Sequence, residues 1–202
     1  MAGAFTHQEI NSIQKKLKQA ARTFAATYGM KKTTVEQLTD YAGISKGAFY
    51  KFYETKEHIF LELTDELHNE LFSKAAEVMQ SATGEPVKDR LALAIRICVQ
   101  RVEDSGFAGF LADESRYLTR KLPLGALMKH RKNDEESVNQ ILAMLGAELN
   151  VSFDMLSSLG RSLMLLVARR QEIGPEFDGM LEILIDGVCG QLFPPNEEYF
   201  IS

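Results

Sequence analysis

Apolar side chains recur every three or four positions along most of the chain, and this spacing predicts helices rather than strands. The first such stripe consists of Ile10, Ile13, Leu17, Ala21, Phe24 and Tyr28. The spacing of Thr6 and Glu9 is typical of a capping box at the start of a helix. Gly29 is a natural end because glycine tolerates positive φ. We therefore expect one amphipathic helix between these two signals.

Two short helices joined by a sharp turn are predicted next. Thr33 and Glu36 have the spacing of a second capping box, followed by a short apolar helix that ends before Gly43. Ser45 can cap a third helix that runs from Lys46 to about residue 52. Because only about three residues separate the two helices, they must cross steeply, as in a helix-turn-helix.

The remainder of the chain also has helical spacing. Thr55 is expected to cap a long helix to about residue 81, and residues 87–103 are apolar enough on all sides for a buried helix. Residues 105–150 are helical with less clear limits, and another helix covers about 153–173. The last helix begins at Gly174-Pro175 and is stopped by Pro194-Pro195. These patterns predict an all-α fold of about nine helices.

The last helix is apolar over well over half of its circumference, at positions 177, 180, 181, 184, 185, 188, 189, 192 and 193. A helix on the surface of a monomer needs only one apolar stripe. The extra width suggests a second buried face against a partner chain, with Gly160, Gly187 and Gly190 allowing close approach. The alternative is a helix at the centre of its own domain.

Charge divides the 202 residues into two parts. Residues 1–56 hold nine Lys and Arg against four Asp and Glu, whereas the rest holds fourteen against twenty-four. A basic head on an acidic body suggests a polyanionic partner for the head, with scattered surface lysines as the alternative. No apolar run approaches the roughly 20 residues of a membrane span, and the first ten residues do not have the pattern of a secretory signal. Cys98 and Cys189 cannot form a disulfide framework, so we expect a reducing, cytoplasmic location.

Residues 33–57, TTVEQLTDYAGISKGAFYKFYETKE, resemble the helix-turn-helix of the tetracycline-repressor (TetR) family of bacterial transcriptional regulators. The matching positions are Thr33, Thr34, Val35, Ala42, Gly43, Ile44, Ser45, Lys46, Gly47, Phe49, Tyr50, Lys56 and Glu57. The resemblance implies a DNA-binding domain over residues 1–52. It also implies a ligand-binding and dimerisation domain over residues 53–202, with the helix at about 55–81 linking the two.

The physical interpretation of these residues agrees with that resemblance. Lys46 can reach guanine O6 and N7, while Gly47 and Ala48 let the helix sit deep in the groove. Tyr50 and Lys51 point outward at helical spacing and can bind phosphates. Thr33, Thr34 and Lys56 lie at helix starts, where hydroxyls, an ammonium and free N–H groups can bind an anion. One departure is that Phe52 and Tyr53 replace a polar ring and a Phe, so Lys51 or the Tyr53 hydroxyl would take over a phosphate contact. The predicted DNA-binding residues are Thr33, Thr34, Ser45, Lys46, Gly47, Ala48, Tyr50, Lys51, Tyr53 and Lys56.

The resemblance further implies a homodimeric repressor that binds a pseudo-palindromic operator and is released by a small molecule. The dimer would be joined by the last two helices, through Leu156, Gly160, Leu163, Leu181, Leu184 and Val188. The apolar, Met-rich body favours a lipophilic effector. Candidate lining residues, which could equally be ordinary core, are Phe107, Phe110, Tyr117, Met128, Met144 and Met164.

Catalysis and metal binding have no support in the sequence. There is no P-loop, GxSxG or dinucleotide fingerprint, so we expect neither an enzyme nor a cofactor. The four histidines, His7, His58, His68 and His130, lack HxxxH spacing and a neighbouring cysteine, so no metal site is predicted. The competing hypothesis is a small-molecule binding or scavenging protein whose DNA-binding head is not functional.

Overall fold

The computed structural model describes residues 5–81, 84–113, 115–145 and 149–193, and the regular elements in these ranges are all α-helices. In chain order they are α1 (His7–Tyr28), α2 (Val35–Ala42), α3 (Lys46–Phe49), α4 (Lys56–Ser81), α5 (Val87–Ser105), α6 (Ala108–Asp113), α7 (Ser115–Lys121), α8 (Leu124–Leu145), α9 (Phe153–Ala168), α10 (Arg170–Ile173) and α11 (Phe177–Leu192). The all-α prediction is confirmed. The number exceeds the expected nine because residues 105–150 form three helices and residues 153–173 form two.

Local signals placed several helix ends correctly. The Thr6 hydroxyl accepts a hydrogen bond from the Glu9 N–H, and the Glu9 carboxylate accepts one from the Thr6 N–H at 2.7 Å. Gly29 ends α1 with φ 79°. The helix predicted over 153–173 instead breaks at Arg169, whose φ of −105° and ψ of 14° lie outside helical geometry. The predicted stop at Pro194-Pro195 falls outside the described residues.

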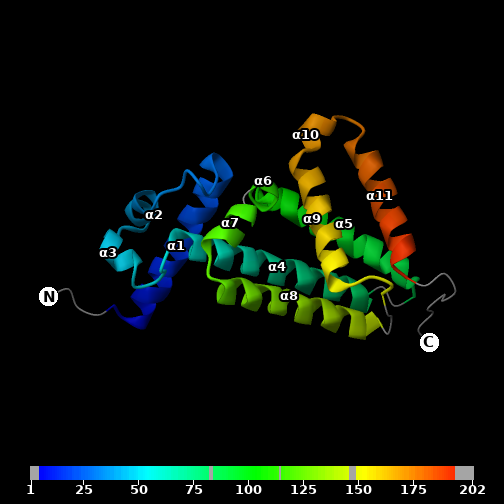
Figure 1. The fold of residues 1–202 in the computed structure, drawn as a ribbon, viewed down its shortest axis with the longest axis horizontal. Helices are drawn as coiled ribbons and strands as arrows, with labels where there is room; N and C mark the ends of the chain where they lie inside the picture. The colour runs from blue at the N-terminus through cyan, green and yellow to red at the C-terminus, as the bar shows by residue number, and fades with distance from the viewer. Residues whose placement is uncertain (1–4, 82–83, 114, 146–148, 194–202) are drawn as a thin grey trace.

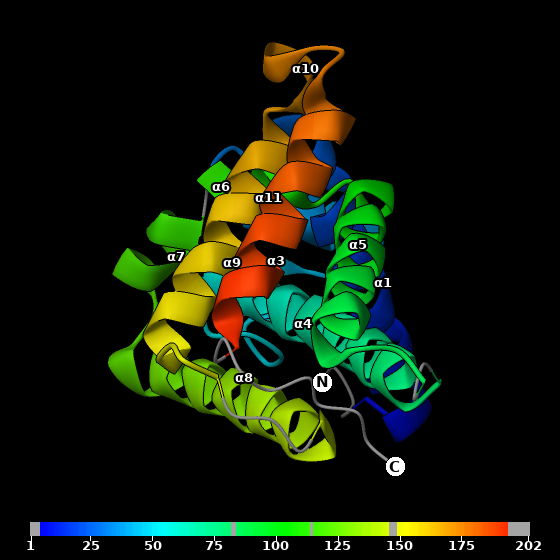
Figure 2. The same ribbon diagram turned by 90° about the vertical axis from the view of Figure 1, so that its right-hand side faces the viewer.

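The helices form an elongated molecule with a head at one end (Figure 1). The head consists of α1, α2 and α3, and α4 runs from beneath it along the length of the body. α8 lies beside α4 and runs in the same direction, and α5 also packs on α4. At the other end, α9 and α11 lie side by side and are joined through α10, with α5 beside them (Figure 2). Among the described residues, no helix has both the length and the hydropathy needed to cross a bilayer.

The core of the head continues into the body. Leu17, Leu38 and Phe49 are fully buried in one cluster with Phe60 of α4 and Phe110 of α6. The Phe60 and Phe110 rings lie 5.6 Å apart. Each such side chain contributes about 1.5–3 kcal/mol through burial. The head is therefore held to α4 and α6 by apolar packing as well as by the chain.

A second region of core lies under α9 and α11. Val99 of α5, Val167 of α9 and Ile185 of α11 belong to one buried cluster. The sequence predicted that α5 would be buried on all sides, but Leu93 on its outer face is 42% exposed. α5 is thus amphipathic, and its inner face holds α9 and α11 on the body.

Candidate nucleic-acid interface

A three-residue turn sets the crossing of α2 and α3. Gly43 adopts a left-handed conformation, with φ 71° and ψ 37°, which a residue with a side chain adopts only at a cost. The Ile44 N–H then donates to the Thr39 carbonyl at 3.0 Å. The Ser45 hydroxyl caps α3 by accepting from the Ala48 N–H at 3.2 Å. These local bonds produce the predicted helix-turn-helix.

α3 is shorter than the sequence predicted. The regular helix ends at Phe49, and the chain continues through tight turns in which the Lys51 N–H donates to the Ala48 carbonyl and the Phe52 N–H donates to the Phe49 carbonyl. Phe52 then packs on Phe5, with ring centroids 5.9 Å apart. The turns keep one side of the segment against the core and present the other side to solvent.

The outer side of this segment, which we call the α3 face, consists of Ser45, Lys46, Gly47, Tyr50 and Lys51, all exposed. Tyr50 is 58% exposed, so its side chain is available to a partner. A Cβ built on Gly47 would meet only the Ser45 hydroxyl at 3.9 Å. The fold therefore does not require glycine at position 47. Glycine nevertheless adds no side-chain bulk to the α3 face, so a partner can approach the backbone closely.

Lys46 projects from the α3 face and forms an exposed ion pair with Glu36 of α2. Exposed pairs of this kind contribute about 0–1 kcal/mol, so the ammonium can exchange its partner at small cost. Lys46 is therefore positioned for an incoming acceptor. Ala48, by contrast, is half-buried beneath the face.

The capping box of α2 lies one residue later than predicted. Thr34, not Thr33, accepts a hydrogen bond from the N–H of Gln37, and the Gln37 side chain accepts from the Thr34 N–H at 2.8 Å. Thr33 is fully buried and donates its hydroxyl to the Gly29 carbonyl at 2.9 Å. Its prediction as a DNA contact is wrong because the residue serves the turn between α1 and α2. Thr34 is exposed and stays a candidate.

Lys56 was also expected to contact phosphate, but its ammonium is used inside the head. It donates to the carbonyls of Met30, Lys31 and Thr33 at 2.8, 3.1 and 2.6 Å. The side chain joins the start of α4 to the turn between α1 and α2. A structural role replaces the predicted one because three acceptors occupy all of its donors.

Tyr53 is another predicted contact that points inward. Its ring is 7% exposed, and its hydroxyl donates to a Glu62 carboxylate oxygen at 2.6 Å. Burial and the neighbouring carboxylate of Glu62 raise the pKa of the Tyr53 hydroxyl far above its usual range. The phosphate contact suggested for Tyr53 is therefore wrong, and Lys51 is the exposed alternative.

Some of the basic charge of the head is neutralised by α4. Lys18 lies 3.2 Å from Glu62 and 2.6 Å from Glu66, and Arg22 lies 2.5 Å from Glu66. The excess of bases in residues 1–56 thus overstates the charge available to a partner. Because these pairs join α1 to α4, they fix the head on the helix that carries it.

The predicted effector residues do not line one cavity. Phe107 and Phe110 are buried with their ring centroids 4.9 Å apart, whereas Met128 and Met144 are 62% and 48% exposed on α8. Met164 packs against the cluster beneath α9 and α11. A hollow of about 580 Å³ lies instead between α5 and α11 and is lined by Arg96, Val99, Gln100, Glu103, Arg170, Asp178, Leu181 and Glu182.

Tyr117, the remaining predicted effector residue, connects the body to the head. Two lysines lie over its ring, with the Lys31 ammonium 5.6 Å and the Lys121 ammonium 5.7 Å from the ring centroid. Its hydroxyl donates to Glu57 at 3.4 Å. Lys31 belongs to the turn between α1 and α2, so α7 contacts the head directly through this ring.

The predicted dimer residues divide into exposed and buried members. Gly160 and Leu184 are exposed, but Leu181 is only 7% exposed, and its place at an interface is wrong because it fills the protein's own core. Leu156, Leu163 and Val188 are half-buried against the body clusters.

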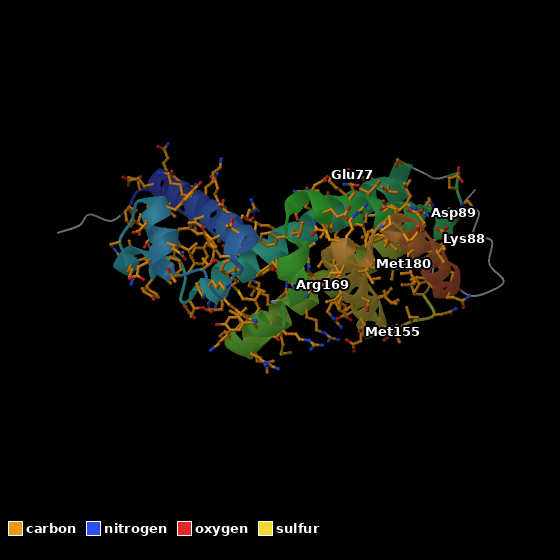
Figure 3. The ribbon with its side chains drawn as sticks, turned by 90° about the horizontal axis from the view of Figure 1, so that it is seen from above. Glu77, Lys88, Asp89, Met155, Arg169 and Met180 are labelled. Atoms are coloured by element: carbon orange, nitrogen blue, oxygen red, sulfur yellow. The ribbon has the colours of Figure 1, made fainter. Side chains whose placement is uncertain are left out.

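The sequence missed the most exposed apolar residues of this region. Met155, Leu165 and Ile183 are 52%, 45% and 75% exposed, and we call these three with Leu184 the α9–α11 face. Met155 and Met180 mark the two helices in the half of the molecule away from the head (Figure 3). For Ile183 the helical period of 3.6 residues was the available signal. Ile183, Gly187 and Gly190 form a stripe on the side of α11 opposite the buried Ile185.

The head of the molecule is similar in sequence to known proteins. Residues 17–63 fit the family model described as bacterial regulatory proteins, tetR family. The HTH-type transcriptional repressor KstR2 of Mycolicibacterium smegmatis is 33% identical over 72 residues, which cover 36% of this chain and 35% of that repressor. The match spans about a third of the length of the curated relatives.

Solved structures extend the likeness to the whole fold. A TetR family transcription regulator from Marinobacter aquaeolei has a TM-score of 0.64 at 17% identity, covering 93% of this chain and 99% of that chain. RolR in complex with its ligand resorcinol has a TM-score of 0.60 at 14% identity, covering 91% and 90%. At such identities the likeness concerns the arrangement of helices.

Proposed function

We propose that this chain, which belongs to the TetR family of bacterial regulatory proteins, is a dimeric repressor that binds a DNA operator and is released by a small molecule. The family consists of transcriptional regulators rather than enzymes. The observation that carries the proposal is the α3 face, where Lys46, Gly47 and Tyr50 are exposed while Phe49, on the inner side of the same segment, is fully buried.

The α3 face has the chemistry needed to read a major groove. The Lys46 ammonium can donate to guanine O6 and N7, and its exchange with Glu36 costs little. Gly47 permits close approach to base edges. The Tyr50 hydroxyl and Lys51 ammonium can donate to phosphates on either side of the groove. We assign DNA binding to residues 1–52, with α4 linking them to the body over 53–202.

The dimer is proposed to form through the α9–α11 face. Its exposed Met155, Leu165 and Ile183 suit burial against a second copy, and Gly160 and Gly187 leave room for close packing of helices. A dimer would place two α3 faces on one duplex, and these must lie about 34–36 Å apart to enter successive major grooves. This spacing is the property that an effector has to change.

We infer that the effector acts through α4 and α7. α4 shares its core with the head, and Tyr117 of α7 contacts Lys31 in the head. A ligand that favours a different position of these helices would change the spacing of the two α3 faces and weaken binding. RolR binds resorcinol, and a small lipophilic or aromatic compound is proposed here as well.

Fluorescence anisotropy with the DNA upstream of the gene for this chain tests whether the α3 face binds DNA. Lys46→Ala should weaken binding by about 1–3 kcal/mol, or roughly 5- to 150-fold, and relax sequence choice. Gly47→Ala should fold normally, since nothing crowds a Cβ there, but should also bind less tightly.

The control for these variants is Lys132→Ala, which removes an exposed lysine from α8 in the body. Its affinity should stay at the wild-type value. Wild-type affinity and sequence choice in both Lys46→Ala and Gly47→Ala would show that the α3 face does not read DNA.

A further inference from the structure

Two histidines that lie 62 positions apart in sequence meet between α4 and α8. Their ring centroids are 5.1 Å apart. His68 Nδ1 lies 2.9 Å from Asp134 Oδ2, and His130 Nε2 lies 3.5 Å from the same oxygen. One ligand atom from each of His68, His130 and Asp134 falls within 4.8 Å of the others. Two imidazoles therefore converge on one carboxylate.

These separations suit a small metal ion. Bonds of about 2.0–2.1 Å from nitrogen and oxygen to a tetrahedral ion place neighbouring ligand atoms roughly 3.3 Å apart. The 2.9 and 3.5 Å distances to Asp134 Oδ2 lie on either side of that value. Small side-chain rotations would admit the ion, and three protein ligands would leave a position for water or another donor.

Asp65 provides a second, independent feature of metal sites. It accepts a hydrogen bond from Nδ1 of His130, the ring nitrogen that does not face Asp134. Metal-binding histidines commonly donate their other N–H to a carboxylate, which fixes the ring and makes the ligating nitrogen more basic. Asp65 thus holds the His130 ring with Nε2 toward the cluster, as a positioning residue.

Burial and charge also favour a cation. The His68, His130 and Asp134 side chains are 27%, 19% and 19% exposed, which leaves a path from solvent. With neutral imidazoles, Asp65 and Asp134 give the cluster a formal charge of −2. Nitrogen donors do not suit Mg²⁺ or Ca²⁺, which prefer oxygen, whereas imidazole suits Zn²⁺ and its first-row neighbours.

We propose that His68, His130 and Asp134 bind a divalent transition-metal ion of the Zn²⁺ type, with Asp65 positioning His130. α4 carries two of these four residues and also supports the head, so the ion would tie α8 to the helix beneath the DNA-binding domain. That consequence rests on the proposed function, whereas metal binding itself does not. Failure to bind zinc would overturn the site and leave the DNA-binding proposal untouched.

Calorimetric titration of the full-length, tag-free protein with Zn²⁺ after treatment with a chelator tests the site. One Zn²⁺ per chain should bind, with a dissociation constant in the micromolar range or tighter. His68→Ala and Asp134→Asn should lose this binding. Asp65→Asn keeps all three ligands and should lose about 10- to 100-fold in affinity. His7→Ala and His58→Ala, which change histidines outside the cluster, should bind as the wild type does.

Thermal unfolding keeps the test decisive if a variant folds poorly. Zn²⁺ should raise the midpoint of the wild type and leave that of His68→Ala unchanged, because only a ligand of the folded state stabilises it. The proposal is overturned if the wild type takes up no Zn²⁺ at 100 µM, or if His68→Ala and Asp134→Asn bind it as the wild type does. In that case the four residues are two ion pairs that join α4 to α8.

Discussion

The α3 face and the α9–α11 face are both exposed, but they differ in chemistry. On α3, Lys46 and Tyr50 present polar groups that water solvates while the partner is absent. On α9 and α11, Leu165 and Ile183 present apolar side chains to water, which is unfavourable until a partner covers them. The first surface suits a partner that comes and goes, and the second suits one that stays.

The two regions also differ in how their residues are fixed. In the head, Gly43 and Ser45 act on neighbours within five positions, through a left-handed turn and a cap. In the body, Arg96 of α5 pairs with Glu182 and Asp186 of α11, almost ninety positions away. Local chemistry shapes the α3 face, whereas long-range pairing shapes the body.

The largest expected effect comes from a charge on the α9–α11 face. Ile183→Glu places a carboxylate at its most exposed apolar position, 75% exposed, so the monomer should fold normally. In a dimer the same carboxylate would be buried without a partner, which costs several kcal/mol. Light scattering at micromolar protein should show a dimer for the wild type and a monomer for the variant.

The control for that experiment is Leu93→Glu, which puts the same charge on an exposed leucine of α5 outside the face. It should stay dimeric. If Ile183→Glu were dimeric as well, the α9–α11 face would not be the dimer interface. The contrast between an apolar face with a lasting partner and a polar face with a transient one would then be lost.

Sequence reasoning succeeded where a short segment determines the outcome. Thr6 with Glu9, Gly43 and Ser45 were identified because caps and left-handed turns depend on residues three or four positions away. Even there, the choice between Thr33 and Thr34 failed. Both residues offer a hydroxyl, and only the buried bond from Thr33 to Gly29 separates their roles.

Residues with distant partners were beyond that reasoning. His68 and His130 lack helical spacing from one another, and they meet only because α4 and α8 pack side by side. Met128 and Met144 were grouped by residue type, but their positions on the outside of α8 depend on which face that helix buries. The helical period predicts that a helix has an apolar stripe, but it does not show which other helix packs against that stripe.

A smaller effect separates lysines with a structural role in the head from those proposed to contact DNA. Lys56→Ala removes three charge-assisted hydrogen bonds to backbone carbonyls and should lower the free energy of unfolding by about 2–3 kcal/mol. Urea unfolding measures this change. Lys32→Ala, at an exposed position of the same turn, should stay within about 0.5 kcal/mol of the wild type. Equal urea midpoints for the two variants would mean that the Lys56 ammonium is not needed for folding and is again a candidate for a phosphate contact.

The smallest effect concerns Tyr53, and it depends on pH. Tyr53→Phe removes the hydrogen bond to Glu62 and should lower stability by about 1–2 kcal/mol at pH 7. Burial raises the pKa of Tyr53 above its unfolded value of about 10, so above that pH the unfolded chain loses a proton that the folded chain keeps. Wild-type stability should therefore fall relative to the variant by about 1.4 kcal/mol per pH unit, and the two should become equal near pH 11. Urea unfolding at pH 7, 10 and 11 measures the gap. A constant gap would mean that the Tyr53 hydroxyl faces solvent, where a phosphate could reach it.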